Sequence, residues 1–232
     1  MVHAASPSSA RAASRPVDVV AFDVDGTLVT HAEGRVVWQI LLERFGCPEG
    51  SSSGRYRAFL DGSITYAEWV DLDVGDWAAA GATRAQIARA VEEELALTEG
   101  AREVVGELKA RGYHLAVVSG TIDVVLDVLF PDHPFELVFT NRIAFAADGQ
   151  IASWQATPYD MDGKRAGLAE IAARLGVAPA RCAFVGDNVN DLSAMELAGL
   201  AVAYDPKHPS VQRAAEVVLP AGRLWDLLDL LP

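Results

Sequence analysis

Two aspartates, one residue apart, stand directly behind the first apolar run of the sequence. The stretch is "AFDVDGTLVT" (21–30), in which Asp23 and Asp25 precede Gly26 and Thr27. One carboxylate in such a pair can attack phosphorus, and the other can donate and accept the proton of the reaction. Two structural alternatives remain open, because "DG" is a common turn dipeptide and Asp or Thr often caps the helix that follows a strand.

Polar side chains also stand at three later points where predicted strands end or helices begin. Ser119 lies in "VVSGT", Lys164 in "MDGKRAGL", and Asp187 and Asp191 lie in "FVGDNVNDLSAM". In an open α/β sheet, ligands bind outside the carboxyl ends of the strands, so these positions are expected to converge. Helix capping is the structural alternative for Ser119, Thr121 and Asp191. A turn is the alternative for Asp187.

Lys164 is the candidate residue that a purely structural role explains least well. A cation in the first turn of a helix opposes the helix dipole, so Lys164 predicts an anion nearby, and phosphate is an anion that these groups could share. Asp23 would attack phosphorus, but its charge would repel a phosphate dianion by about 4 kcal/mol at about 4 Å and an effective dielectric near 20. A Mg²⁺ ion between Asp23 and Asp187 would remove most of this repulsion, since oxygen ligands of this kind suit Mg²⁺.

The remaining groups would complete the phosphate site. Lys164, the Ser119 hydroxyl and backbone N–H groups at helix starts would hold the phosphoryl oxygens. Asp25 would protonate the leaving oxygen and then activate the attacking water. The opening pair of aspartates therefore predicts one nucleophile and one proton shuttle.

Short apolar runs that alternate with helical patterns must position these residues. The predicted strands are Val17–Phe22, His114–Val118, Leu137–Thr140, Cys182–Val185, Leu200–Ala203 and, more weakly, Val217–Leu219. The predicted helices are Ala101–Arg111, Thr121–Phe130, Lys164–Leu175 and Leu192–Ala198. This alternation predicts an α/β fold with a doubly wound, Rossmann-like parallel sheet. A hairpin is expected over 141–155, turning at Asp148–Gly149.

Residues 30–98 interrupt this rhythm and predict a helical insert after the first strand. The segment has helical periodicity broken by "GCPEGSSSGR" (46–55). Its three tryptophans, Trp38, Trp69 and Trp77, are expected to form the insert's own core rather than a ligand site. The predicted organisation is a tail at 1–16, a core domain at 17–29 and 99–232, and an inserted domain at 30–98.

Composition limits the partners and the compartment. The formal net charge of −13 argues against nucleic acid or an anionic membrane as the main partner. Cys47 and Cys182 lie far apart without metal spacing, which predicts free thiols in a reducing cytoplasm. No apolar run approaches the roughly eighteen residues of a membrane span. Residues 1–16 are a poor secretory signal and are expected to form a disordered tail, with an organelle transit peptide as the alternative.

Four ordered motifs resemble those of the haloacid dehalogenase superfamily: "DVDGT", "SGT", the lysine of "DGKRAG" and "GDNVND". The resemblance covers approximately residues 17–220, and aspartate at position 25 is typical of the phosphatases in that superfamily. The insert is similar to the superfamily's helical cap. The segments "TEGAREVVGELKARGYHLAVVSG" and "FTNRIAF" are similar to its phosphoserine-phosphatase-like branch.

The resemblance implies a role for each candidate residue. Asp23 is implied as the nucleophile and Asp25 as the general acid and base. The implied Mg²⁺ ligands are the Asp23 carboxylate, the Asp25 backbone carbonyl and Asp187, and Asp191 supports them from behind. The residues implied to bind phosphate are Thr27, Ser119, Gly120, Lys164 and Asn188.

The expected function is Mg²⁺-dependent hydrolysis of a small organic phosphate through an aspartyl-phosphate intermediate, by a monomer or homodimer. One alternative is a phosphotransferase that passes the phosphoryl group to an alcohol, as some relatives do. Another is a receiver-like regulatory domain. A receiver, however, takes its phosphorylated aspartate from a mid-chain strand and lacks an insert after the first strand.

The insert sequence argues against phosphoserine as the substrate. In phosphoserine phosphatases an arginine seven residues after an aromatic binds the substrate carboxylate, and counting seven from Tyr66 leads here to Asp73. Their glutamate for the substrate ammonium falls on Ala32. An aspartate repels a carboxylate, so a neutral or amine-bearing phosphomonoester is expected to fit better unless Arg55 or Arg57 substitutes. The alternative is that the aspartate faces solvent.

Overall fold

A seven-stranded sheet forms the centre of the structure, a computed structural model that describes residues 17–48 and 50–232. The strand order is β6-β5-β4-β1-β7-β8-β9, and neighbouring strands are parallel except for β5 and β6. The strands are β1 (Val19–Phe22), β4 (His114–Ile122), β5 (Leu137–Phe145), β6 (Ile151–Gln155), β7 (Cys182–Gly186), β8 (Leu200–Tyr204) and β9 (Val217–Leu219). The predicted doubly wound α/β fold is confirmed.

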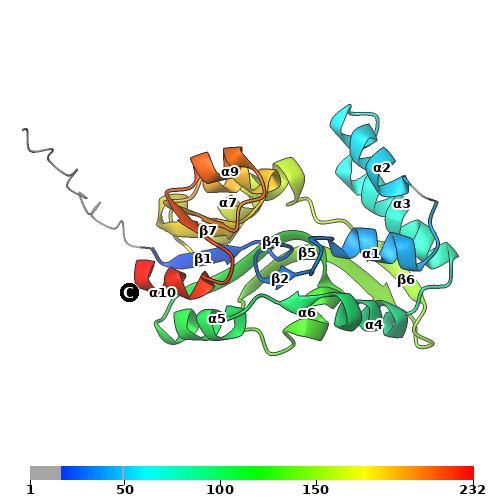
Figure 1. Ribbon diagram of the computed structural model, residues 1–232, viewed down its shortest axis with the longest axis horizontal. Coiled ribbons are helices and arrows are strands. Elements are labelled where there is room, and N and C mark those ends of the chain that lie inside the picture. Colours follow the sequence, from blue (N-terminus) through cyan, green and yellow to red (C-terminus); the bar gives the residue numbers. More distant parts are fainter. Residues whose placement is uncertain (1–16, 49) are drawn as a thin grey trace, which may run out of the picture.

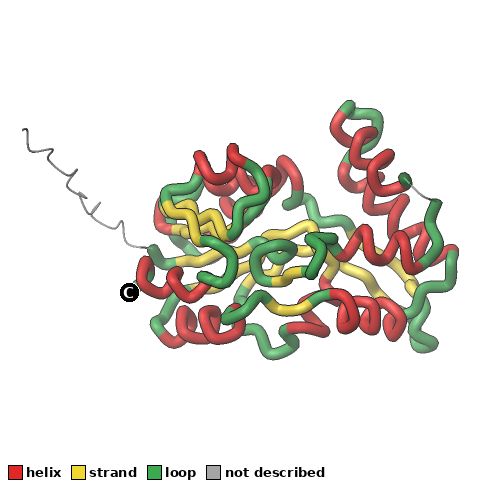
Figure 2. Tube along the Cα trace, in the orientation of Figure 1, coloured by secondary structure: helices red, strands yellow, loops and turns green. Residues whose placement is uncertain are grey.

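Helices cover both faces of the sheet because alternate strand residues point to opposite sides. Val20 and Phe22 of β1 pack with the helices on one face. Val19 and Ala21 pack with those on the other. Figures 1 and 2 show the strands between these two helical layers. The first layer holds α5 (Ala101–Ala110) and α6 (Asp123–Leu129), and the second holds α7 (Lys164–Arg174), α8 (Leu192–Met195) and α9 (Pro209–Ala214).

Four helices lie between two short strands that join this part of the chain to the sheet. The strands β2 (Val29–Thr30) and β3 (Ala96–Leu97) pair antiparallel, so the chain leaves and returns through one narrow ribbon. The helices are α1 (Val37–Arg44), α2 (Ser51–Leu60), α3 (Tyr66–Ala79) and α4 (Arg84–Glu94). Side-chain caps fix where two of them begin, because Thr65 accepts from the Glu68 N–H and Thr83 from the Gln86 N–H.

The insert does not stand apart from the sheet as a whole. α4 packs against α6, and α3 contacts β6, whereas α2 and the outer part of α3 project away from the sheet (Figure 1). The expectation that all three tryptophans form the insert's core holds for the fully buried Trp77. Trp38 packs on Trp77 and Trp69 packs on Phe59 within the insert, and both also line a cavity.

The connection between β4 and α6 differs from the prediction. The sequence predicts a helix from Thr121, but in the structure β4 runs on to Ile122 and α6 begins at Asp123. Val118 pairs with Phe139 and Ile122 with Asn141, so four steps on β4 match two on β5. This bulge changes the direction of the side chains between Val118 and Ile122. The polar residues Ser119 and Thr121 therefore lie in an irregular strand and not at the start of a helix.

The predicted hairpin is present between β5 and β6, and it turns through Gly149 at φ +84°.

Cys47 is half-buried and Cys182 buried, and both are free thiols. Within the described ranges, none of the helices combines the length and apolar character needed to cross a membrane. The tail predicted at 1–16 lies outside the described residues. The remaining short helices are η1 (Met161–Gly163), η2 (Pro179–Arg181), η3 (Val189–Asp191), η4 (Leu224–Asp226) and α10 (Leu227–Leu230).

Candidate active site

Strand β1 delivers the first pair of aspartates to the carboxyl edge of the sheet. The Asp23 N–H donates to the Val185 carbonyl of the neighbouring strand β7 at 2.9 Å, which fixes the point where β1 ends. The chain then turns at Gly26, whose φ of +85° favours glycine. A Cβ on Gly26 would also collide with the Asp187 carboxylate. The glycine of "DVDGT" therefore allows the first and last motifs to approach each other.

Asp191 holds the loop after β7 in place. Its Oδ2 accepts the N–H groups of Asp187 at 2.8 Å and Asn188 at 3.0 Å, and its Oδ1 accepts from Lys164 Nζ at 2.7 Å. The side chain is fully buried. These three bonds use both carboxylate oxygens, so Asp191 orients its neighbours rather than facing the cavity.

The Lys164 ammonium joins two of the motifs. It is fully buried at the first position of α7, and Nζ lies 2.8 Å from Asp23 Oδ1 and 4.0 Å from Asp160 Oδ1. Burial by itself lowers the pKa of Lys164, but the charges of Asp191, Asp23 and Asp160 raise it above its ordinary value. Lys164 therefore carries its charge, which Asp23, Asp160 and Asp191 balance. The phosphate predicted beside it stays a prediction.

The acidic group around Asp187 suits a divalent cation. Oxygens of Asp23, Asp187 and Asp191 all lie within 4.8 Å of one another. Asp187 is only 3% exposed, yet its Oδ1 has no hydrogen-bond partner among the described residues. Burial and the charge of Asp23 raise the pKa of Asp187 well above its ordinary value. A bound Mg²⁺ would supply the missing partner and offset the repulsion between the carboxylates.

Asp25 has surroundings that suit its predicted role, whereas phosphate binding by Thr27 stays a prediction. Asp25 is half-buried, and burial together with the charge of Asp23 raises its pKa to about 7. A carboxyl group with such a pKa can both give and take a proton near neutral pH. Thr27 is fully buried, and its Oγ1 lacks a hydrogen-bond partner within the described part of the chain.

A cavity of about 140 Å³ opens above these groups. Of the predicted residues it brings together Asp23, Asp25, Ser119, Gly120 and Asn188. Its other lining residues are Val36, Trp38, Asp160 and Asn190. The structure places Thr27, Lys164, Asp187 and Asp191 as buried residues, and they do not line this cavity.

The bulge of β4 carries Ser119 and Gly120 to the cavity wall. Ser119 is buried, and its Oγ accepts the N–H of Thr121 at 3.2 Å. A Cβ on Gly120 would collide with the Asp160 carboxylate. The N–H groups of this segment therefore belong to a strand irregularity, and the prediction that they lie at a helix start is wrong.

Asn188 has a structural task besides its place at the cavity. Its Oδ1 accepts the Val189 N–H at 2.8 Å and so caps η3. Its side chain is exposed at the cavity rim. The expectation that Asn188 binds phosphate stays a prediction.

Several residues at the site did not emerge from the sequence. The Gly120 carbonyl accepts from Trp38 Nε1 of α1 at 2.8 Å and from Asn141 Nδ2 of β5 at 2.7 Å. Asn141 Nδ2 also donates to the Tyr66 hydroxyl at 2.7 Å. Asp160 could have been found from its i, i+4 spacing to Lys164. Trp38 and Tyr66 carry no such signal, because aromatic residues on helices usually belong to a core.

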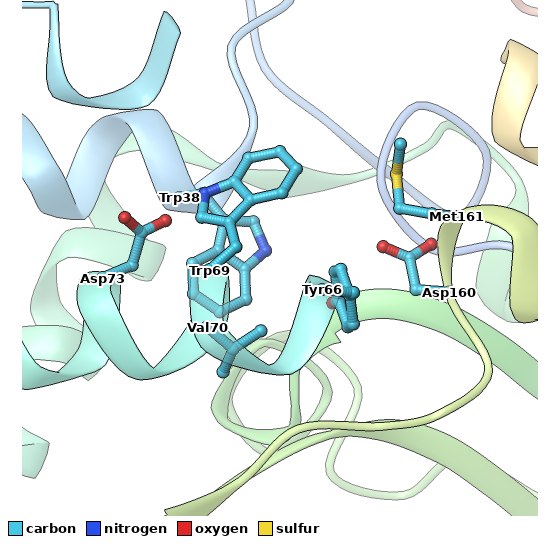
Figure 3. Close-up of a pocket in the computed structure, with 7 residues that line it drawn as sticks. All are labelled: Trp38, Tyr66, Trp69, Val70, Asp73, Asp160 and Met161. Carbon is cyan, nitrogen blue, oxygen red and sulfur yellow. The ribbon is translucent and has the colours of Figure 1, made fainter. Parts of the chain in front are cut away.

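A second cavity of about 60 Å³ adjoins the first, and the two share Trp38 and Asp160. Figure 3 shows its lining: Trp38, Tyr66, Trp69, Val70, Asp73, Asp160 and Met161. Asp73 is 1% exposed and is paired with Arg55, which also pairs with Asp76. Burial raises the pKa of Asp73 even though Arg55 opposes the shift. Asp73 therefore does not face solvent.

The chain is similar to several known proteins. A family model described as haloacid dehalogenase-like hydrolase matches residues 17–199. The phosphoserine phosphatase SerB2 of Mycobacterium tuberculosis is 30% identical over 214 residues, which are 92% of this chain and 50% of SerB2. The phosphoserine phosphatase of Halobacterium salinarum is 30% identical over 191 residues, 82% of this chain and 86% of the relative. The chain thus spans about half the length of several relatives that it matches.

A solved structure agrees with this assignment. A phosphoserine phosphatase determined as an analogue of its phospho-aspartyl intermediate has a TM-score of 0.73 at 24% identity, covering 94% of this chain and 100% of that one. At that identity the likeness shows a shared fold. Since the family match spans residues 17–199 and the fold agrees with it, this protein belongs to the haloacid dehalogenase-like hydrolases and resembles their phosphoserine-phosphatase-like branch, as its motifs predicted.

Proposed function

We propose that the protein hydrolyses a small phosphomonoester in the cavity above Asp23, with Mg²⁺ bound and through an aspartyl-phosphate intermediate. The observation that carries the proposal is the pairing of buried Lys164 with Asp23, beside an Asp187 oxygen that is buried without a partner. Membership of a hydrolase family favours an enzyme over a receiver-like regulatory domain.

The chain's own residues account for the two half-reactions. Asp23 attacks phosphorus, and the bond from phosphorus to the substrate oxygen breaks while Asp25 protonates that oxygen. Asp25 then takes a proton from the water that attacks the aspartyl-phosphate, which releases inorganic phosphate and frees Asp23. Lys164 and Ser119 hold the phosphoryl oxygens during both steps. Asp23, Asp187 and the Asp25 carbonyl would hold Mg²⁺, which would supply positive charge against the phosphate.

The insert at 30–98 is proposed as a cap that covers the substrate, next to a core domain at 17–29 and 99–232. Its helices α1 and α3 supply Trp38 and Tyr66, which stand at the side of the cavity where the alcohol part of a phosphomonoester would lie. Closure over the cavity would exclude water from the aspartyl-phosphate until the alcohol has left.

Phosphoserine is the second candidate substrate, because the relatives carry the name phosphoserine phosphatase. We favour a phosphomonoester without a carboxylate. Asp73 stands where the arginine of those enzymes is expected, and Arg55 is held by Asp73 and Asp76. The protein is proposed to act in the cytoplasm, as a monomer or homodimer.

The direct test is phosphate release from a panel of phosphomonoesters, with Mg²⁺ and with a chelator. Release that requires Mg²⁺ is the expected result. Addition of alcohols separates hydrolysis from transfer, since a phosphotransferase would convert them into phosphate esters. Absence of any release from the panel in Mg²⁺ would overturn the proposal.

A further inference from the structure

We propose that the cavity of Figure 3 holds the alcohol part of the substrate and selects a phosphomonoester that carries an alkylammonium group and no carboxylate. This inference rests on the proposed phosphatase function and names the substrate class of the same site. Phosphoethanolamine and phosphocholine represent the chemistry.

Aromatic rings form much of the cavity wall. Trp38 comes from α1, and Tyr66 and Trp69 come from the first turns of α3 (Figure 3). The rings of Tyr66 and Trp69 are 6.3 Å apart at an interplanar angle of 76°. Rings set at such angles present both faces and edges to one small volume, and the faces of tryptophan and tyrosine attract a cation.

Carboxylates supply the charge that a cation requires. Asp73 and Asp160 line the cavity. Within the part of the chain that the structure describes, none of the seven lining residues is a lysine or an arginine. Arg55 is shared between Asp73 and Asp76, so these three side chains together keep a net negative charge. Lys164 Nζ lies 4.0 Å from Asp160 but within 2.8 Å of Asp23 and Asp191. Its positive charge is therefore balanced mainly by Asp23 and Asp191, and Asp160 keeps its negative charge toward the cavity.

The same charges disfavour phosphoserine. Its carboxylate would enter a cavity lined by Asp73 and Asp160, and Arg55 would have to leave two aspartates to bind it. A carboxylate near one unit charge of the same sign is repelled by about 4 kcal/mol at about 4 Å and an effective dielectric near 20.

The cavity adjoins the phosphate site, and hydrogen bonds hold two of its rings in place. Trp38 and Asp160 line both cavities, so a phosphate above Asp23 directs its alcohol toward the aromatic rings. The Trp38 indole is fixed on the Gly120 carbonyl at 2.8 Å, and the Tyr66 hydroxyl is fixed by Asn141 Nδ2 at 2.7 Å. Rings that are already in place lose little freedom when a ligand binds.

The test compares a cation with a neutral molecule of the same shape. Phosphocholine and 3,3-dimethylbutyl phosphate differ only in the central atom, nitrogen with a positive charge against carbon. We expect kcat/KM for phosphocholine or phosphoethanolamine to exceed that for 3,3-dimethylbutyl phosphate by about tenfold or more, as a desolvated cation–π contact implies. We expect phosphoserine to be the poorest substrate. A cation-to-neutral ratio near one, or phosphoserine as the best substrate, would overturn the inference.

A variant series checks that the aromatic ring is responsible. Trp69→Leu keeps apolar bulk but removes the ring face, so the ratio of kcat/KM for phosphocholine to that for its neutral isostere should fall toward one. Trp69→Phe should give an intermediate ratio, because phenylalanine attracts cations less than tryptophan does. Trp225, which is 44% exposed and outside the cavity lining, provides the matched control, and Trp225→Leu should leave the ratio unchanged. An unchanged ratio in Trp69→Leu would count against the cavity.

The inference and the proposed function can fail separately. If p-nitrophenyl phosphate is hydrolysed but the ratio is near one, the phosphatase assignment stands and the inference is wrong. If no phosphate is released from any ester, the proposed function is wrong, and the cavity is then tested by binding. Choline should quench tryptophan fluorescence at about tenfold lower concentration than 3,3-dimethylbutanol, and equal affinity would contradict the inference.

Discussion

Lys164 Nζ lies 2.8 Å from Asp23 Oδ1, and both side chains are buried. The cation proposed to hold the phosphate thus contacts the carboxylate proposed to attack it. This contact aligns Asp23 and lowers the repulsion between it and an incoming phosphate.

The first prediction concerns the nucleophile. Asp23→Asn should lower kcat/KM by about a thousandfold or more, because an amide cannot attack phosphorus. The circular dichroism spectrum should be unchanged. Asp148→Asn in the exposed hairpin turn is the control and should keep full activity. Retention of a tenth of the activity by Asp23→Asn would show that the aspartyl-phosphate mechanism is wrong.

The second prediction separates the two aspartates of the first motif. Asp25→Asn should still be phosphorylated by an aryl phosphate, whose leaving group needs no proton, but it should release phosphate slowly because nothing activates the water. Rapid-quench trapping of labelled enzyme measures both steps. Equal loss in the two half-reactions would contradict the role given to Asp25.

The third prediction concerns the buried lysine. Lys164→Met leaves Asp23 and Asp191 without their counter-charge, so the free energy of unfolding in urea should fall by about 3–5 kcal/mol. Lys109→Met is the matched control, since its pair with Glu136 lies at the surface and should contribute about 0–1 kcal/mol. Similar losses in the two variants would mean that the buried pair has little structural importance.

The fourth prediction links pH, metal and stability. Burial and Asp23 raise the folded-state pKa of Asp187 above its ordinary 3.8, so the folded metal-free protein holds a proton that the unfolded chain releases. This group therefore costs no stability below about pH 3.8, and the cost grows as the pH rises toward the raised pKa. Mg²⁺ should remove that cost.

Thermal unfolding with chelator and with Mg²⁺ measures this linkage. The increase in Tm caused by Mg²⁺ should be larger at pH 8 than at pH 5. Asp187→Asn should lose most of this pH dependence, because the amide does not titrate. A metal effect that is equal at both values would show that Asp187 is not the linked ligand.

The sequence was sufficient for the sheet and for the motifs at its edge. Buried parallel strands need apolar residues on both faces, so a continuous apolar run such as Val19–Phe22 is recognisable as a strand from the sequence. Asp23 and Asp187 follow such runs directly, and a polar residue behind a buried strand has few places to lie other than the sheet edge.

Other features depend on contacts between distant segments, which the sequence does not reveal. Ser119 and Gly120 look the same in a strand–helix turn and in a bulge, and only pairing with β5 extends β4 to Ile122. Trp38 and Trp77 have the same helical pattern. Trp77 packs into the core, while Trp38 reaches the Gly120 carbonyl of another element.

The short ribbon of β2 and β3 has a consequence for folding. β1 and β4 are neighbours in the sheet although all four insert helices separate them in sequence. Pairing Val29 with Leu97 closes that long loop at its neck, and the entropy of closing a loop grows only slowly with its length. Because α4 also packs on α6 and α3 contacts β6, we expect the insert helices to reach their full stability only together with the sheet.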